Sequence, residues 1–228
     1  MHPALLTFDV FGTVLDWRRG LERSLRRHGA GLTRADFDRV IDTQAELESG
    51  PFRPYASIVA ASLVRELGIP LATARAIGDE AGRWPLYPDS REALRRLRRI
   101  APCVASTNSD QRHGRQVERE LGFDLDGWIC AEEVRCYKPD PGFWRHVSAR
   151  RGVPFGADWW HVSAYGDYDL ETARRLGLTT VFVSRPHARP GPADLRVRDL
   201  AELADRLVAA GGKNLTAPRP MFPREEIQ

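Results

Sequence analysis

The sequence of 228 residues predicts an α/β fold in which a parallel β-sheet carries helices on both faces. Three observations lead to this prediction. From about residue 88 onward, short apolar segments alternate with amphipathic segments of helical period. A first apolar segment, residues 4–8, stands apart from them near the N-terminus. The stretch between the two, about residues 15–86, shows helical patterns without a strand, so we expect a helical insert after the first strand.

Four predicted helices follow the first strand, and glycine and proline separate them. Glycines in residues 29–31 end the first helix, a Gly-Pro pair at residues 50–51 ends the second, and a Gly-Ile-Pro segment at residues 68–70 ends the third. We expect these helices at residues 17–29, 33–49, 55–67 and 72–82.

The second half of the chain begins with a helix over residues 88–100, where Asp89 and Glu92 have capping-box spacing. Its arginines are interpreted as the solvated face of an amphipathic helix rather than a nucleic-acid site, because no stacking aromatics lie between them. Strands are expected next at residues 102–106, 127–131, 159–164 and 179–183, and helices at 112–122, 140–152, 170–177 and within 193–211.

These elements divide the chain into three predicted parts. The core comprises residues 1–14 and 87–212, a helical cap comprises residues 15–86, and a proline-rich, loosely ordered tail comprises residues 213–228.

Composition narrows the class of protein. The chain is 42% hydrophobic and 29% charged, which is typical of a globular protein, and its net charge is +3. We expect no membrane partner, because no apolar run approaches the ~20 residues that a spanning helix needs, and no secretory signal. The three cysteines show no CxxC spacing, which favours reduced thiols and a cytoplasmic location.

Polar residues that could carry chemistry fall at or just past the ends of the predicted strands. Asp9 closes the first strand, Thr107 and Asn108 follow the second, Lys138 lies in a later loop, and Asp169 opens a helix. Ligands of open α/β sheets bind beyond the carboxyl ends of the strands. Each residue alone could be an ordinary turn or loop residue, but together they predict nucleophilic catalysis by Asp9 on a small-molecule substrate.

Four segments, FDVFGTVLD, ASTNSD, CYKPDP and HVSAYGDYDLETARRLGL, resemble in this order the four motifs of the haloacid dehalogenase (HAD) superfamily. The segment DTQAELESGPFRPYASIV also resembles the cap of type II (S)-2-haloacid dehalogenases and their uncharacterised relatives. The resemblance covers roughly residues 4–210. It implies a Rossmann-like core, a cap inserted after the first strand, and a homodimer.

The resemblance also assigns roles to the residues at the strand ends. Asp9 would be the nucleophile, Thr107 would hydrogen-bond the nucleophile or the substrate with Asn108 beside it, and Lys138 would keep Asp9 ionised. Asp169 would correspond to the second acid of the fourth motif. We expect it to orient or deprotonate the water of a hydrolytic step.

Phe11 indicates the kind of reaction. Phosphoryl-transferring members of the superfamily resemble one another in an Asp-x-Asp motif whose second acid protonates the leaving alcohol, and Phe11 stands at that position. The first metal-binding acid of the fourth motif falls at Ala164, which leaves Asp9 and Asp169 with Asp167 as a substitute, so we expect no metal and no cofactor. Halide leaves without a proton, which favours hydrolytic dehalogenation of small 2-haloacids through an ester on Asp9.

Two alternatives remain open at this point. One is a magnesium-dependent phosphatase acting on a small phosphate ester, with Asp167 as a recovered ligand. The other is a catalytically silent domain that serves as an interaction module.

The substrate pocket departs from the family pattern in two ways. Characterised haloacid dehalogenases resemble one another in an arginine on the first long cap helix, and that position falls here near Asp42. Arg39 or Arg53 could replace it, and each could equally be a surface charge. We expect Phe11 to line the pocket, and Tyr165 and Tyr168 to reshape the part that receives the halide.

Overall fold

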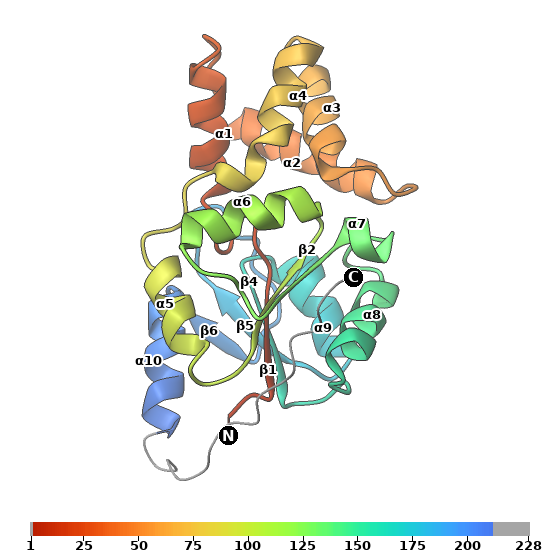
Figure 1. Ribbon diagram of the computed structural model, residues 1–228. Coiled ribbons are helices and arrows are strands. Elements are labelled where there is room, and N and C mark those ends of the chain that lie inside the picture. The colour runs from red at the N-terminus through yellow and green to blue at the C-terminus, as the bar shows by residue number, and fades with distance from the viewer. Residues whose placement is uncertain (1, 212–228) are drawn as a thin grey trace, which may run out of the picture.

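The computed structural model describes residues 2–211 and shows a six-stranded parallel sheet with strand order β3-β2-β1-β4-β5-β6 (Figure 1). The predicted α/β class is confirmed. The tail predicted at residues 213–228 lies outside the described residues. The strands are β1 (Leu5–Phe8), β2 (Cys103–Thr107), β3 (Gly127–Cys130), β4 (Trp159–Ser163), β5 (Thr179–Val183) and the short β6 (Leu195–Val197), which the sequence pattern did not separate from the last helix.

Helices cover both faces of the sheet because the strands are apolar on both sides. Alternate residues point to opposite faces, so Leu5 and Leu6 belong to different cores. Leu6 packs with α5 (Ser90–Leu97), α6 (Gln111–Leu121) and α10 (Leu200–Gly211), whereas Leu5 packs with α8 (Pro141–Arg151) and α9 (Glu171–Arg175). A four-residue helix that was not expected, α7 (Ala131–Val134), follows β3.

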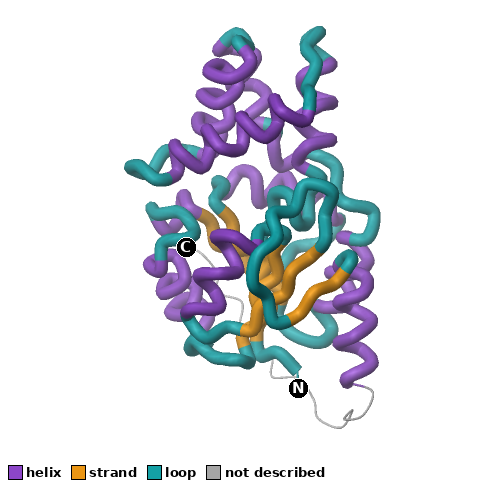
Figure 2. Tube along the Cα trace, turned by 180° about the vertical axis from the view of Figure 1, so that it is seen from behind, coloured by secondary structure: helices purple, strands orange, loops and turns teal. Residues whose placement is uncertain are grey.

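The helical segment between β1 and α5 lies across the carboxyl ends of the strands (Figures 1 and 2). The helix expected at 72–82 divides here into α4 and a 3₁₀ turn. Thr33 begins α2 with a capping box, and Gly68 ends α3 in the left-handed conformation. The elements are α1 (Trp17–Arg26), α2 (Arg34–Glu48), α3 (Tyr55–Leu67), α4 (Leu71–Asp79) and the 3₁₀ turn η1 (Ala81–Arg83).

Two buried residues at the start of α6 tie the helices between β1 and α5, which we call the cap, to the rest of the fold, which we call the core. The Asp110 carboxylate accepts hydrogen bonds from the backbone N–H groups of Tyr55 (2.8 Å) and Ala56 (3.1 Å) at the start of α3. His113 Nε2 lies 2.9 Å from the carbonyl oxygen of Gly78 at the end of α4. The residue at the N-cap position of α3 is Pro54, whose side chain makes no capping hydrogen bond. The Asp110 carboxylate caps α3 in its place.

In the part of the chain that the structure describes, no helix is long and apolar enough to cross a membrane. Cys130 and Cys136 are free thiols.

Candidate active site

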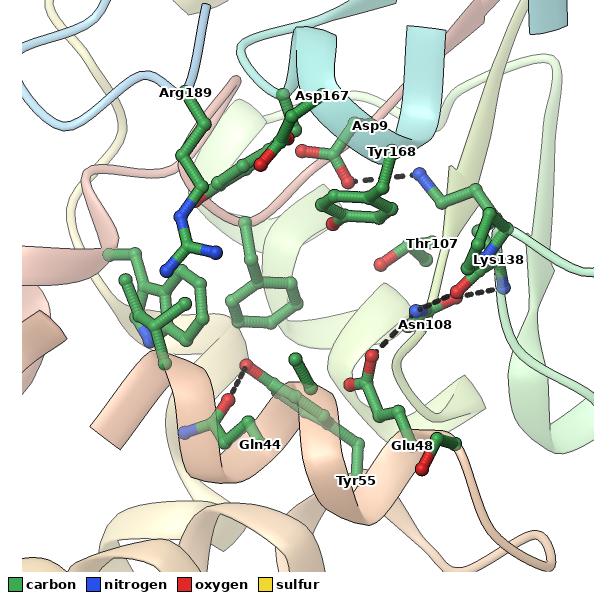
Figure 3. A pocket seen from close by; sticks show the side chains of 17 residues that line it. Asp9, Gln44, Glu48, Tyr55, Thr107, Asn108, Lys138, Asp167, Tyr168 and Arg189 are labelled. Atoms are coloured by element: carbon green, nitrogen blue, oxygen red, sulfur yellow. Dashed lines mark hydrogen bonds and ion pairs between the residues drawn. The ribbon is translucent and has the colours of Figure 1, made fainter. Parts of the chain in front are cut away.

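A cavity of about 300 Å³ lies between the carboxyl edge of the sheet and the cap helices. Core and cap both contribute to its lining (Figure 3). The core residues are Asp9, Phe11, Thr107, Asn108, Lys138, Pro139, Tyr165, Asp167, Tyr168 and Arg189, and those from the cap region are Trp17, Ile41, Gln44, Ala45, Glu48, Ser49 and Tyr55. This volume is at the small end of ligand pockets, so the cavity suits a small substrate.

Asp9 follows β1, and both of its carboxylate oxygens are held. Thr13 donates a 2.7 Å hydrogen bond to Oδ2, and Lys138 Nζ lies 3.1 Å from Oδ1. The backbone N–H of Ala164 in turn donates to the Thr13 hydroxyl (2.9 Å), which fixes its direction. The turn between Asp9 and Thr13 requires Gly12, since its φ is +90° and a Cβ there would overlap the Tyr165 hydroxyl.

Lys138 joins two carboxylates in a site that is closed to solvent. Its ammonium lies 2.7 Å from Asp169 Oδ2 as well as 3.1 Å from Asp9, and its side chain is 1% exposed. Burial raises the pKa of Asp9, and Lys138 opposes that rise. Burial alone would also raise the pKa of Asp169, but Lys138 and His161 together outweigh it and lower that pKa. Asp169 thus stays ionised and balances the lysine.

Asp169 is fully buried and is not part of the described cavity lining. Its side chain is 0% exposed, Oδ2 contacts both Lys138 and His161 Nε2 (3.1 Å), and it is not among the described residues that line the cavity. The connection from β4 to α9 forms a π-helical turn, Gly166–Leu170, which turns Asp169 into the protein. Asp167, two residues earlier, lines the cavity instead. Asp169 therefore lies where it can position Lys138, and its action on a water stays a prediction.

Thr107 and Asn108 line the cavity where β2 ends, as the strand-end argument predicts. The Asn108 side chain accepts a hydrogen bond from the Lys138 backbone N–H (2.7 Å) and donates to Glu48 Oε2 on the cap (2.7 Å). Burial raises the pKa of Glu48 to about 8, although Asn108 and Lys138 oppose the rise. Glu48, which we did not single out from the sequence, thus favours its protonated form at neutral pH more than an exposed glutamate does.

Aromatic side chains form the apolar part of the lining. Phe11 packs against Tyr55 (ring centroids 5.0 Å apart) and edge-on against Trp84 and His113. Tyr165 and Tyr168 both line the cavity, and their rings are 5.7 Å apart. Phe11, Tyr165 and Tyr168 therefore lie where we expected them.

The two arginines proposed from the sequence lie elsewhere. Arg39 pairs with Asp36 on the outer face of α2, and Arg53 is exposed in the loop before α3; both are described and neither lines the cavity. Arg189, in the loop after β5, reaches the cavity from the core (Figure 3). The rule that located the other residues, a loop beyond the carboxyl end of a strand, could have located Arg189 too.

Within residues 2–211, no group of three or more His, Cys, Asp or Glu side chains is arranged to hold a metal ion. The cation that neutralises Asp9 and Asp169 is the ammonium of Lys138.

Comparisons with known proteins identify the family of this chain. A family model described as haloacid dehalogenase-like hydrolase matches residues 3–177. The curated (S)-2-haloacid dehalogenase 4A of Burkholderia cepacia is 28% identical over 125 residues. The match covers 51% of this chain and 53% of that protein, so it spans about half the length of the relative.

Two solved structures are similar over most of the chain. The defluorinating L-2-haloacid dehalogenase Rha0230 has a TM-score of 0.77 at 25% identity and covers 90% of this chain and 95% of its own. The L-2-haloacid dehalogenase PA0810 has a TM-score of 0.76 at 27% identity and covers 92% of this chain and 100% of its own.

Proposed function

The chain belongs to the haloacid dehalogenase-like hydrolases, and within that family we propose that it hydrolyses the carbon–halogen bond of small 2-haloacids without a metal ion. The similarity to (S)- and L-2-haloacid dehalogenases supports this substrate class. The observation that carries the proposal is Phe11, an apolar ring in the cavity wall two residues after Asp9. A leaving group that departs beside Phe11 receives no proton from it, which suits halide and does not suit an alcohol.

Asp9 performs the first step of this mechanism. Its ionised carboxylate attacks C2 of the haloacid, a bond forms between an Asp9 oxygen and C2, and halide departs with the bonding electron pair. Thr13 and Lys138 orient the carboxylate and oppose the rise in its pKa that burial causes. This division of a difficult displacement into two steps is the usual gain of covalent catalysis.

Hydrolysis of the resulting ester is the second step. Water attacks the Asp9 carbonyl carbon, the acyl–oxygen bond breaks, and the 2-hydroxyacid leaves after its oxygen takes a proton. Two carboxyl groups face the cavity, Asp167 and Glu48. Glu48 favours its protonated form at neutral pH because its pKa is about 8, so we assign the water-activating base to Asp167, which could contribute ~10²–10⁴-fold.

Halide release tests the proposal. Purified protein and an Asp9→Asn variant are incubated with 2-chloropropionate, 2-bromopropionate and chloroacetate in the presence of a chelator, and free halide is measured. We expect release by the wild type only, with ¹⁸O from labelled water appearing in Asp9 after a single turnover. Magnesium-dependent phosphate release from a phosphate ester without halide release would favour the phosphatase alternative, and neither activity would favour an interaction module.

Trapping of the ester tests the assignment of the base. Asp167→Asn should release one equivalent of halide and leave the alkylated Asp9 peptide detectable by mass spectrometry. Asp169→Asn should impair the first step and accumulate no ester, because Asp169 acts through Lys138. Accumulation of ester in Asp169→Asn alone would return the base role to Asp169.

We also propose a location and an oligomeric state for the protein. The free thiols fit a reducing cytoplasm, and the family resemblance favours a homodimer. Size-exclusion chromatography with light scattering measures the assembly directly.

A further inference from the structure

The charges in the cavity leave one cation available to an incoming anion. Of the described residues that line the cavity, Lys138 and Arg189 are the cationic ones. Lys138 is buried and already contacts two carboxylates, at 3.1 and 2.7 Å. Arg189 therefore offers the positive charge that a small anionic substrate can reach, across the cavity from Asn108 and Glu48 (Figure 3).

The backbone of the Arg189 loop is fixed against the end of β4. The Arg189 N–H donates to the carbonyl of Ala164 (3.0 Å), and its own carbonyl accepts from the N–H of Gly166 (2.6 Å). Gly166 and Gly191 pack backbone to backbone, since a Cβ at either position would overlap the other. The guanidinium thus extends from a rigid support at the same edge of the sheet as Asp9.

The Arg189 guanidinium forms an ion pair with the exposed carboxylate of Asp42. Arg189 Nη2 lies 2.6 Å from Asp42 Oδ1 on cap helix α2, and the Asp42 side chain is 66% exposed. Solvent-exposed pairs of this kind are weak, and this contact uses one of the five N–H donors of the guanidinium. A substrate carboxylate can form two parallel hydrogen bonds with the same group.

We propose that Arg189 binds the carboxylate of the substrate and that Asp42 is an internal competitor which the substrate displaces. This inference rests on the proposed function for the identity of the substrate, a short 2-substituted carboxylic acid. When the substrate carboxylate replaces Asp42 as the partner of Arg189, the contact between α2 and the loop after β5 is broken. Asp42 therefore lowers the affinity for the substrate, and Arg189 determines the preference for acids over neutral analogues.

Equilibrium binding tests the inference independently of dehalogenation. 2-Hydroxypropionate, which has no halogen to lose, is titrated calorimetrically into the wild type and into the Arg189→Met, Arg189→Lys and Asp42→Asn variants. We expect Arg189→Met to weaken binding about 10- to 100-fold, as loss of a hydrogen-bonded charge pair does, and Arg189→Lys to weaken it less. Asp42→Asn should strengthen binding severalfold. Arg39→Met, on the same cap helix as Asp42, is the matched control and should bind like the wild type.

The outcomes separate this inference from the proposed function. Equal binding by wild type and Arg189→Met, or no binding of short acids by the wild type, would overturn the role of Arg189. If halide release then persists in Arg189→Met with an unchanged KM, the dehalogenase proposal stands without it. In the expected case, Arg189→Met raises KM for 2-chloropropionate but not for 2-chloropropionamide, and thermal unfolding confirms that the variant is folded.

Discussion

Replacement of Lys138 by methionine tests how far the active site depends on one buried ammonium. The substitution keeps a long apolar side chain and removes the charge that lies 3.1 Å from Asp9 and 2.7 Å from Asp169. The side chains of Lys138, Asp9 and Asp169 are 1%, 8% and 0% exposed, so bulk solvent compensates little for the lost partner. Removal of one partner from a buried ion pair typically costs about 3–5 kcal/mol of unfolding free energy.

The dependence of this cost on pH follows from the pKa shifts. The carboxylates of Asp169 and Asp9 stabilise Lys138⁺ and raise its pKa, although burial alone would lower it. That stabilisation is fully present below the unfolded lysine value of about 10.5 and is lost as the pH rises through the folded pKa. Asp169, with its lowered pKa, contributes above its unfolded value of about 3.9 and less as the pH falls through its folded pKa. Between these limits the wild type retains both contributions.

In the Lys138→Met variant the two carboxylates lose the cation that they share, so each favours its protonated form more than in the folded wild type. We expect urea unfolding to show a loss of about 3–5 kcal/mol at pH 8 and a smaller loss at pH 5, where protonation relieves the repulsion. Halide release at neutral pH should fall at least ~10²-fold, the effect of removing one electrostatic stabiliser, because a protonated Asp9 is a poor nucleophile.

Two further variants test whether the loss of stability in Lys138→Met comes from the buried charge or would follow the loss of any ion pair. Adding Asp169→Asn to Lys138→Met should restore part of the lost stability. Arg98→Met breaks the half-exposed pair with Asp126 (3.0 Å) and should cost about 1 kcal/mol or less without affecting activity. A loss below about 1 kcal/mol in Lys138→Met that does not change with pH would refute the argument from buried charge.

Three more predictions concern the surroundings of the site. Asp110→Ala should cost about 0.5–2 kcal/mol in urea unfolding, because it removes the cap of α3, and should raise KM; unchanged values would mean that packing alone holds the cap. In the wild type, KM for a haloacid should rise as the pH passes about 8, where Glu48 becomes charged, and Glu48→Gln should abolish that rise in a steady-state pH series. Gly166→Ala should displace the loop that carries Arg189 and raise KM, whereas Gly156→Ala, in open space, should leave KM unchanged.

The fold could be predicted because the sequence switches between short apolar segments, typical of buried strands, and amphipathic segments of helical period. Apolar strands that alternate with amphipathic helices produce a parallel sheet, and parallel sheets bring their strand ends to one edge. Asp9, Asn108 and Lys138 lie at that edge in the structure and line one cavity, as the strand-end argument requires. The family matches confirm the HAD resemblance that the four motifs indicated.

The direction of individual side chains could not be predicted from the same patterns. Arg39 belongs to the polar face of α2 and pairs within its own element and with α3, and helical period alone does not distinguish such a residue from one that reaches a pocket. Arg189 lies in an irregular loop, so no periodicity points to it. The strand-end rule indicates this loop, but which of its side chains reaches the cavity depends on backbone pairing with the segment after β4, which only the folded chain shows.

The fourth motif shows how one extra residue redistributes roles among carboxylates. The motif is one residue longer than the family pattern, and the structure contains a π-helical turn, Gly166–Leu170, at this point. That turn directs Asp169 inward to Lys138 and His161 and leaves Asp167 in the cavity. Asp9, Asp167 and Asp169 are chemically identical groups, yet Asp9 is held by Thr13 and Lys138, Asp167 lines the cavity and Asp169 is buried beside Lys138. Residue spacing places all three near the site, and it is burial and charge that determine which reaction step each can serve.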